Sequence, residues 1–79
     1  MDSIEKILQQ MSGNPQGVRF NDLKRVCKQY FGKGRQKGDH IIYKMPWQGD
    51  PRINIQNDNG KAKTYQVRKV LKAIARLEL

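Results

Sequence analysis

The chain has 79 residues, enough for one small domain, and its 16 Lys and Arg against seven Asp and Glu give a net charge of +9. Such an excess favours a polyanionic partner, nucleic acid or an acidic protein before a membrane surface. No apolar run approaches the ~18 residues that span a bilayer, and the N-terminus lacks the apolar segment of a secretory signal, so we expect a cytoplasmic protein without a membrane partner. One cysteine and one histidine argue against a disulfide or a zinc site, and we expect neither metal nor cofactor.

The first predicted element is a helix over residues 2–11. Asp2, with Glu5 three residues later, resembles a capping box at its start. Its apolar residues are spaced to form one stripe: Ile4, Ile7, Leu8 and Met11. Residues 12–17 contain two glycines and a proline and are expected to form a loop. We therefore divide the chain into an N-terminal extension, 1–17, packed on a main domain, 18–79.

A second helix is predicted over residues 22–31, with Asn21 as its N-cap. Its apolar stripe consists of Leu23, Val26, Cys27 and Tyr30. Cys27 is interpreted as a buried thiol that packs like a small apolar residue, rather than as a reactive group. Gly32 and Gly34 end this helix and lead into a first strand over residues 33–37.

The central stretch of the chain is a predicted hairpin. Gly38-Asp39 is a glycine-first pair between two extended segments, which indicates a tight two-residue turn with positive φ at Gly38. A second strand follows over residues 40–45, and Pro46 ends it. Alternation places Ile41, Tyr43 and Met45 on one face and His40, Ile42 and Lys44 on the other.

The only histidine, His40, stands at the start of this strand, directly after the turn. Arg35, Lys37 and Lys44 lie nearby in the sequence. A titratable base among fixed cations is suited to holding a phosphate and moving a proton. The alternative is that His40 is an ordinary polar residue near a turn.

Residues 46–51 form a connection in which Trp47 either stacks on a base or, as we favour, covers an edge of the core. A third strand is predicted over residues 52–57, with Ile53 and Ile55 on one face. The other face has Arg52, Asn54 and Gln56 and is expected to be open to water. If His40 shares that face, it is a basic, hydrogen-bonding surface with one titratable group; the alternative is a solvated face without a ligand.

The last predicted elements are a turn over residues 58–60 and a helix over residues 65–77 with Thr64 as its N-cap. The apolar stripe of this helix consists of Val67, Val70, Leu71, Ile74 and Leu77. Lys61 and Lys63 come just before it, where backbone N–H groups also attract anions.

Without the first helix the predicted order is α-β-β-β-α. Two helices then pack on one face of a three-stranded antiparallel sheet, an α+β arrangement. That order matches the fold of double-stranded-RNA-binding domains, with an extra N-terminal helix.

The sequence also resembles the HicA family of mRNA interferase toxins, over roughly residues 18–77. The residues that carry the resemblance are Arg35 to His40 followed by Ile41 to Lys44, which are similar to the glycine-serine-histidine element of the family. Phe20 to Leu23 and Lys63 to Leu71 resemble the family at the starts of the two helices. Two positions depart from the pattern: Asp39 stands where serine is usual, and Ile41 where many members carry a second histidine.

The resemblance implies a toxin of a type II toxin-antitoxin system that cleaves mRNA without a metal, with His40 as its catalytic acid or base. It also implies a HicB-type antitoxin that inhibits the nuclease in a hetero-oligomer. The RNA-binding candidates are Arg35, Lys37, Gly38, Lys44, Arg52, Asn54, Lys61 and Lys63. Tyr43 is expected to face the core, so the second proton carrier is left unassigned. The alternatives are a non-catalytic RNA-binding module of the same fold and a basic protein that binds only an acidic partner chain.

Overall fold

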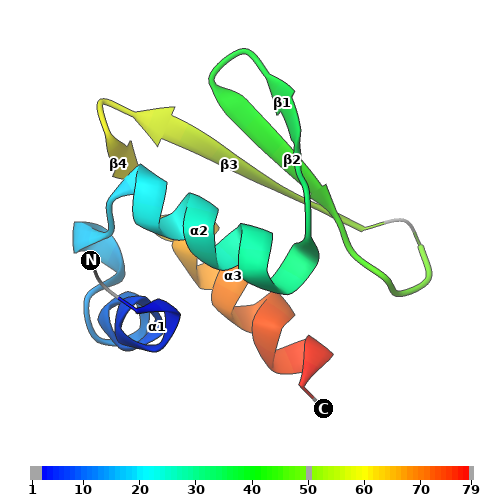
Figure 1. Ribbon diagram of the computed structural model, residues 1–79, viewed down its shortest axis with the longest axis horizontal. Coiled ribbons are helices and arrows are strands. Elements are labelled where there is room, and N and C mark those ends of the chain that lie inside the picture. Colours follow the sequence, from blue (N-terminus) through cyan, green and yellow to red (C-terminus); the bar gives the residue numbers. More distant parts are fainter. Residues whose placement is uncertain (1–2, 50, 79) are drawn as a thin grey trace.

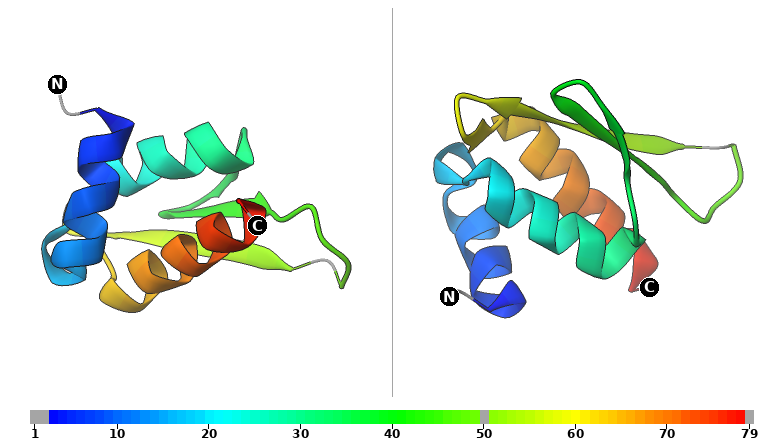
Figure 2. Two further views of the ribbon diagram at one scale, coloured as in Figure 1. Left: turned by 90° about the horizontal axis from the view of Figure 1, so that it is seen from below. Right: turned by 45° about the horizontal axis from the view of Figure 1, so that its top comes forward.

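Three α-helices and a four-stranded antiparallel sheet make up the chain in this computed structural model, which describes residues 3–49 and 51–78 (Figure 1). The helical elements are α1 (Ile4–Gly13), the 3-10 turn η1 (Pro15–Gly17), α2 (Phe20–Phe31) and α3 (Thr64–Leu77). The strands are β1 (Arg35–Lys37), β2 (His40–Lys44), β3 (Arg52–Asp58) and β4 (Lys61–Ala62), in that order across the sheet. The helices lie together on one side of the sheet (Figure 2).

The predicted α+β class, with helices on one face of an antiparallel sheet, is confirmed. The sheet has a fourth strand that the sequence did not indicate, because β4 is only two residues long and has no alternation to detect. It pairs with the end of β3 through Asn57↔Ala62 and Asp58↔Lys61. Asn59 and Gly60 form the turn between them, with φ of 52° and 86°, the left-handed values typical of a tight hairpin.

Two predicted helix starts are wrong by one or two residues. Helix α2 begins at Phe20 with Arg19 at its cap position, so Asn21 lies inside the helix. The backbone there is tied to the β3–β4 hairpin, since the Phe20 N–H donates to the Gly60 carbonyl at 3.0 Å. Helix α3 begins at Thr64 rather than after it.

Among the described residues, the group that caps the start of α1 is a serine hydroxyl. The Ser3 hydroxyl accepts a hydrogen bond from the Lys6 N–H at 3.2 Å, as an N-cap does. The capping box predicted at Asp2 falls on a residue outside the described part of the chain.

A single apolar core joins the helices to the sheet. The alternation predicted for β2 and β3 is confirmed, because Ile41, Tyr43, Ile53 and Ile55 are all buried. Helix α1 contributes Ile7 and Met11 to the same core. No helix in the described ranges is long and apolar enough to cross a membrane.

Two positions, one within α2 and one just beyond it, show how tightly this core is packed. Cys27 is fully buried, and burial raises the pKa of its thiol to about 12, so it is a protonated, apolar-packing group as predicted. At Gly34 a Cβ atom would lie 2.5 Å from Ile41 Cγ2 and 2.6 Å from Tyr43 Cε1. Only glycine lets the chain pass this close over β2 on its way into β1.

Candidate active site

The hairpin between β1 and β2 places His40 at the first position of β2. Lys37 pairs with His40 across the hairpin, which leaves Gly38 and Asp39 as the two-residue turn. Gly38 has a φ of 61°, as predicted for a glycine-first turn. The Gln36 side-chain amide donates to the Gly38 carbonyl at 2.8 Å and closes the turn from the β1 side.

The strand register brings the predicted polar residues onto one face of the sheet. Directly opposed residues on neighbouring strands share a face, and the pairs here are Lys37↔His40, His40↔Gln56, Arg35↔Ile42, Ile42↔Asn54 and Lys44↔Arg52. This face is the one away from the helices, because the alternate residues Ile41, Tyr43, Ile53 and Ile55 are buried. We call it the open face. His40 therefore shares a surface with the cations expected around it.

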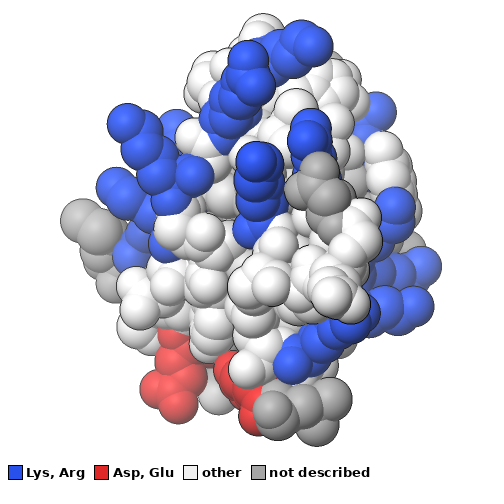
Figure 3. All heavy atoms as spheres, turned by 90° about the vertical axis from the view of Figure 1, so that its right-hand side faces the viewer, with Lys and Arg blue, Asp and Glu red and all other residues white. Residues whose placement is uncertain are grey.

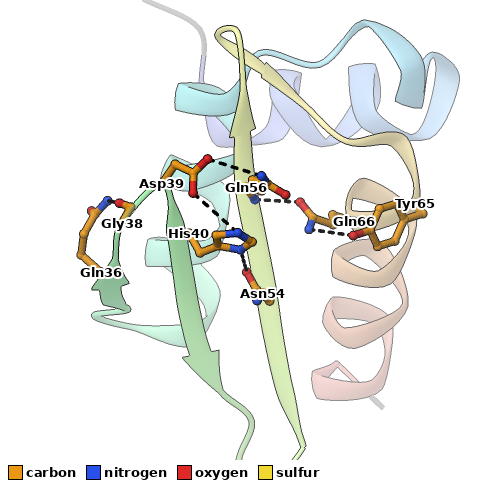
Figure 4. A network of polar contacts seen from close by, with 8 residues as sticks. All are labelled: Gln36, Gly38, Asp39, His40, Asn54, Gln56, Tyr65 and Gln66. Carbon is orange, nitrogen blue, oxygen red and sulfur yellow. Dashed lines mark hydrogen bonds and ion pairs between the residues drawn. The ribbon is translucent and has the colours of Figure 1, made fainter.

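The His40 ring is held by one side chain and approached by another (Figure 4). Its Nδ1 lies 2.9 Å from Asn54 Oδ1, and its Nε2 lies 3.6 Å from Asp39 Oδ1. The His40 side chain is 36% exposed, so the ring is accessible to a ligand in solution. An amide oxygen only accepts hydrogen bonds, so Nδ1 is the donor and, in the neutral ring, Nε2 bears the lone pair. Nε2 is thus the atom able to exchange a proton with a substrate.

Asp39, the second residue of the turn, contacts the third strand. Its backbone carbonyl accepts from the Asn57 N–H at 3.1 Å, and its carboxylate is 3.4 Å from the Gln56 side-chain nitrogen, a long contact. The carboxylate is 61% exposed, so water screens it. Its negative charge repels a phosphate.

A buried glutamine connects this site to the helix layer, and the sequence reasoning missed it. Gln66, in the first turn of α3, is 3% exposed, and its Oε1 accepts from the Gln56 N–H at 2.8 Å. Its amide nitrogen donates to the Tyr65 hydroxyl at 3.2 Å (Figure 4). The sequence contains one signal for it: Gln66 is a polar residue next to Val67, which belongs to the apolar stripe of this helix.

Most of the predicted RNA-binding residues lie on the same side of the sheet as His40. Arg35, Lys37, Lys44, Arg52 and Asn54 all lie on the open face, and Gly38 forms the turn above it. Lys61 is also on the open face, because it pairs with Asp58, but this pair lies at the far end of β3 from Lys44 and Arg52. Lys63 follows β4 at the start of α3, where its carbonyl accepts from the Gln66 and Val67 N–H groups. The structure therefore unites six of the eight candidates and leaves Lys61 and Lys63 apart.

Positive charge is not confined to the open face. Figure 3 shows the side of the molecule on which the β2–β3 connection lies, and Lys and Arg side chains are spread over most of it. The Asp and Glu side chains visible there lie only at its lower end. A polyanion that bound at His40 would meet further cations along this side.

Tyr43 is three residues from His40 in the sequence but does not lie in the site. It is 2% exposed and faces the helices, as predicted from alternation. Burial, with a smaller contribution from the Cys27 thiol, raises the pKa of Tyr43 to about 12. A phenol that holds its proton so firmly and has no access to solvent is not a proton carrier at neutral pH.

Within the described ranges, no three His, Cys, Asp or Glu side chains come together to hold a metal ion. Comparisons of this chain with protein-family models, curated proteins and solved structures gave no match.

Proposed function

We propose that this protein is a metal-independent endoribonuclease of the HicA type, in which His40 is the catalytic acid–base. The observation that supports it is the placement of the His40 ring: it is open to solvent, fixed through Nδ1 by Asn54, and on the same face of the sheet as Lys37, Arg35, Lys44 and Arg52. A ring positioned in this way presents Nε2 to a ligand that the cations hold by its phosphates.

The reaction that fits this site is attack of an RNA 2′-hydroxyl on the adjacent phosphorus. Nε2 of His40 takes the proton from the 2′-oxygen, that oxygen forms a bond to phosphorus, and the bond to the 5′-oxygen breaks. The products are a 2′,3′-cyclic phosphate and a 5′-hydroxyl end, the latter protonated by water or by a second group. Lys37, directly opposite His40, is placed to stabilise the charge that develops on the phosphate oxygens.

The cellular role that follows is that of a cytoplasmic toxin acting on mRNA. A HicB-type antitoxin would inhibit it by covering the open face with acidic and apolar side chains. The charge of +9 fits both ligands, because RNA and an acidic protein compete for the same cations.

One observation favours the second candidate, a non-catalytic RNA-binding module. The Asp39 carboxylate lies 3.6 Å from Nε2, the atom that would need to approach the ribose. In a binding module this carboxylate is harmless, because grip on the RNA backbone needs no histidine.

The experiment that separates these candidates is incubation of the purified protein with single-stranded RNA in EDTA. The nuclease produces fragments with 2′,3′-cyclic phosphate ends, and the His40→Ala variant does not. A salt-sensitive shift of intact RNA by both proteins would instead establish the binding module. No affinity for RNA at physiological salt would leave the acidic partner chain as the ligand.

A further inference from the structure

A cavity of about 220 Å³ lies between the β2–β3 connection and α3, away from His40. Its walls are Met45, Trp47 and Pro51 from the connection, Arg52 and Ile53 from β3, and Lys69, Lys72, Ala73 and Arg76 from α3. It is smaller than the ~300 Å³ at which pockets for drug-sized ligands begin. The cavity therefore suits a flat group of the size of one base better than a whole cofactor.

The α3 wall of this cavity is a stripe of cations with a small residue in its middle. Lys69, Lys72, Ala73 and Arg76 are spaced i, i+3, i+4 and i+7, so they lie along one side of the helix. The Ala73 methyl group leaves room between the longer side chains. Lys69, Lys72 and Arg76 are exposed and put three positive charges on the rim.

The opposite wall supplies an aromatic ring. Trp47 packs against the core, and the Arg76 guanidinium lies over its ring, 4.4 Å from the centroid. This agrees with the expectation that Trp47 covers an edge of the core. The stacked guanidinium is itself a planar surface of the kind on which RNA bases stack.

Arg52 connects this cavity to the proposed active site. It lines the cavity and is also opposite Lys44 in the last row of the open face. About 13 Å of strand separates Lys44 from His40, at ~3.3 Å per residue. That distance corresponds to about four nucleotides at the ~3.4 Å spacing of a stacked strand.

We propose that this cavity is a subsite for single-stranded RNA, which binds a base a few nucleotides from the scissile phosphate. The base stacks on the Trp47–Arg76 pair, and the flanking phosphates contact Lys69 and Lys72. The proposal rests on RNA being the substrate at His40. An acidic peptide would also meet the cations, but the stacked ring and guanidinium, continuous with the open face through Arg52, favour a ligand with alternating bases and phosphates.

Trp47 is the only tryptophan in the chain, so its fluorescence reports on this cavity alone. The probe is a series of oligoribonucleotides of two to ten nucleotides with 2′-O-methyl riboses, which lack the attacking hydroxyl and cannot be cleaved. We expect Trp47 emission to change on binding of oligomers longer than about four nucleotides, and affinity to rise at the same length. Binding, measured by anisotropy, without any change in Trp47 emission overturns the proposal.

The charge contribution is tested with a matched pair of double variants. Lys69→Gln with Lys72→Gln alters the cavity, and Lys24→Gln with Lys28→Gln removes the same charge from exposed positions on α2. We expect the cavity variant to bind a ten-nucleotide oligomer roughly tenfold more weakly, with a slope of log K against log salt reduced by about 1.4. The α2 variant should change the affinity and the slope much less. Equal effects from both pairs mean non-specific attraction and overturn the subsite.

Arg76→Gln tests the stacking surface while leaving Trp47 in place. Loss of one stacked base weakens binding by about tenfold, and we expect that loss only with oligomers long enough to reach the cavity. These binding assays are independent of cleavage. If Trp47 responds to RNA but the wild-type protein cuts nothing, the nuclease assignment fails and the subsite stands; if the protein cuts RNA with Trp47 silent, the reverse holds.

Discussion

Asn54 Oδ1 lies 2.9 Å from His40 Nδ1 and joins β3 to β2 diagonally across the open face, since His40 is directly opposite Gln56 and Asn54 is opposite Ile42. This one contact fixes both the ring orientation and the nitrogen that faces solvent. The strands are held in place by the core residues on their other face, and the Asn54 side chain in turn holds the imidazole in one orientation. The site is thus preorganised by its neighbour strand rather than by a loop.

The first prediction concerns His40 itself. His40→Ala removes the group that we propose transfers the proton, and we expect RNA cleavage to fall by about 10²–10⁴-fold. RNA binding should persist, because the surrounding cations remain. Cleavage is measured by gel with end-labelled RNA in EDTA, and binding by anisotropy. Cleavage at the wild-type rate by His40→Ala would place the chemistry elsewhere.

The second prediction assigns Asn54 a positioning role. Asn54→Leu removes the acceptor of the Nδ1–H hydrogen bond, so the ring is no longer held. We expect kcat to fall roughly tenfold with KM little changed. A tenfold change in rate corresponds to about 1–1.5 kcal/mol, the contribution of one hydrogen bond. Asn54→Asp keeps an acceptor but adds a negative charge that favours the imidazolium. In that variant the limb of the pH–rate profile that reports His40 should move to higher pH. An unchanged profile in Asn54→Asp, with the protein folded, contradicts the role.

The third prediction concerns the Asp39 carboxylate. Asp39→Asn retains the shape of the side chain and removes a charge 3.6 Å from Nε2, which would otherwise repel phosphate. We expect RNA affinity to increase about twofold to fivefold at low salt, because the carboxylate is largely exposed and its effect is screened. Asp58→Asn, which removes the same charge at the far end of β3, is the control. If both variants behave alike, the effect is net charge and Asp39 has no local influence on the site.

The open face could be derived from the sequence because it depends on alternation alone. Once Ile41 and Tyr43 are assigned to the core, the facing of His40 follows, and the two-residue turn at Gly38 fixes the register with β1. The fourth strand and the helix starts could not be derived. They depend on contacts between distant segments, such as the Phe20 N–H on the Gly60 carbonyl, which outweigh the local capping preference of Asn21.

The cavity on α3 illustrates the same limit. The spacing of Lys69, Lys72 and Arg76 can be seen in the sequence, but it fits an ordinary solvated helix face equally well. Only the path of the β2–β3 connection, which brings Trp47 beneath Arg76, gives the stripe a second wall. The roles of Asn54 and Gln66 likewise required the geometry of two neighbouring elements.

The fourth prediction is that Gln66 holds β3 against α3. Gln66→Leu fills the same space but leaves the Gln56 N–H without its acceptor, and we expect a loss of about 1–3 kcal/mol in the free energy of unfolding. Urea denaturation measures it. Gln9→Ala, at an exposed position on α1, is the control and should lie within about 0.5 kcal/mol of wild type. A Gln66→Leu protein as stable as the control would show that the hydrogen bond makes no net contribution.

The fifth prediction is a loss of stability at alkaline pH that originates in the core. Burial raises the pKa of the Cys27 thiol from its ordinary value of 9.0 to about 12. Below pH 9 the thiol is protonated in both the folded and the unfolded chain, so it makes no pH-dependent contribution. Above pH 9 only the unfolded chain releases the proton, and the free energy of unfolding falls by up to about 1.4 kcal/mol per pH unit.

Urea denaturation of the wild-type protein and of Cys27→Ala at pH 8, 9 and 10 tests this. Cys27→Ala is less stable at every pH because it leaves a cavity, so the slopes are compared rather than the values. Tyr43, with its pKa raised to about 12 from 10.0 mainly by burial, adds to the decline only above pH 10, so it leaves the comparison between pH 9 and pH 10 unaffected in both proteins. We expect the decline between pH 9 and pH 10 to be steeper in the wild type. Equal slopes would mean that the thiol ionises as readily in the folded protein as in the unfolded chain, which the complete burial of Cys27 does not allow.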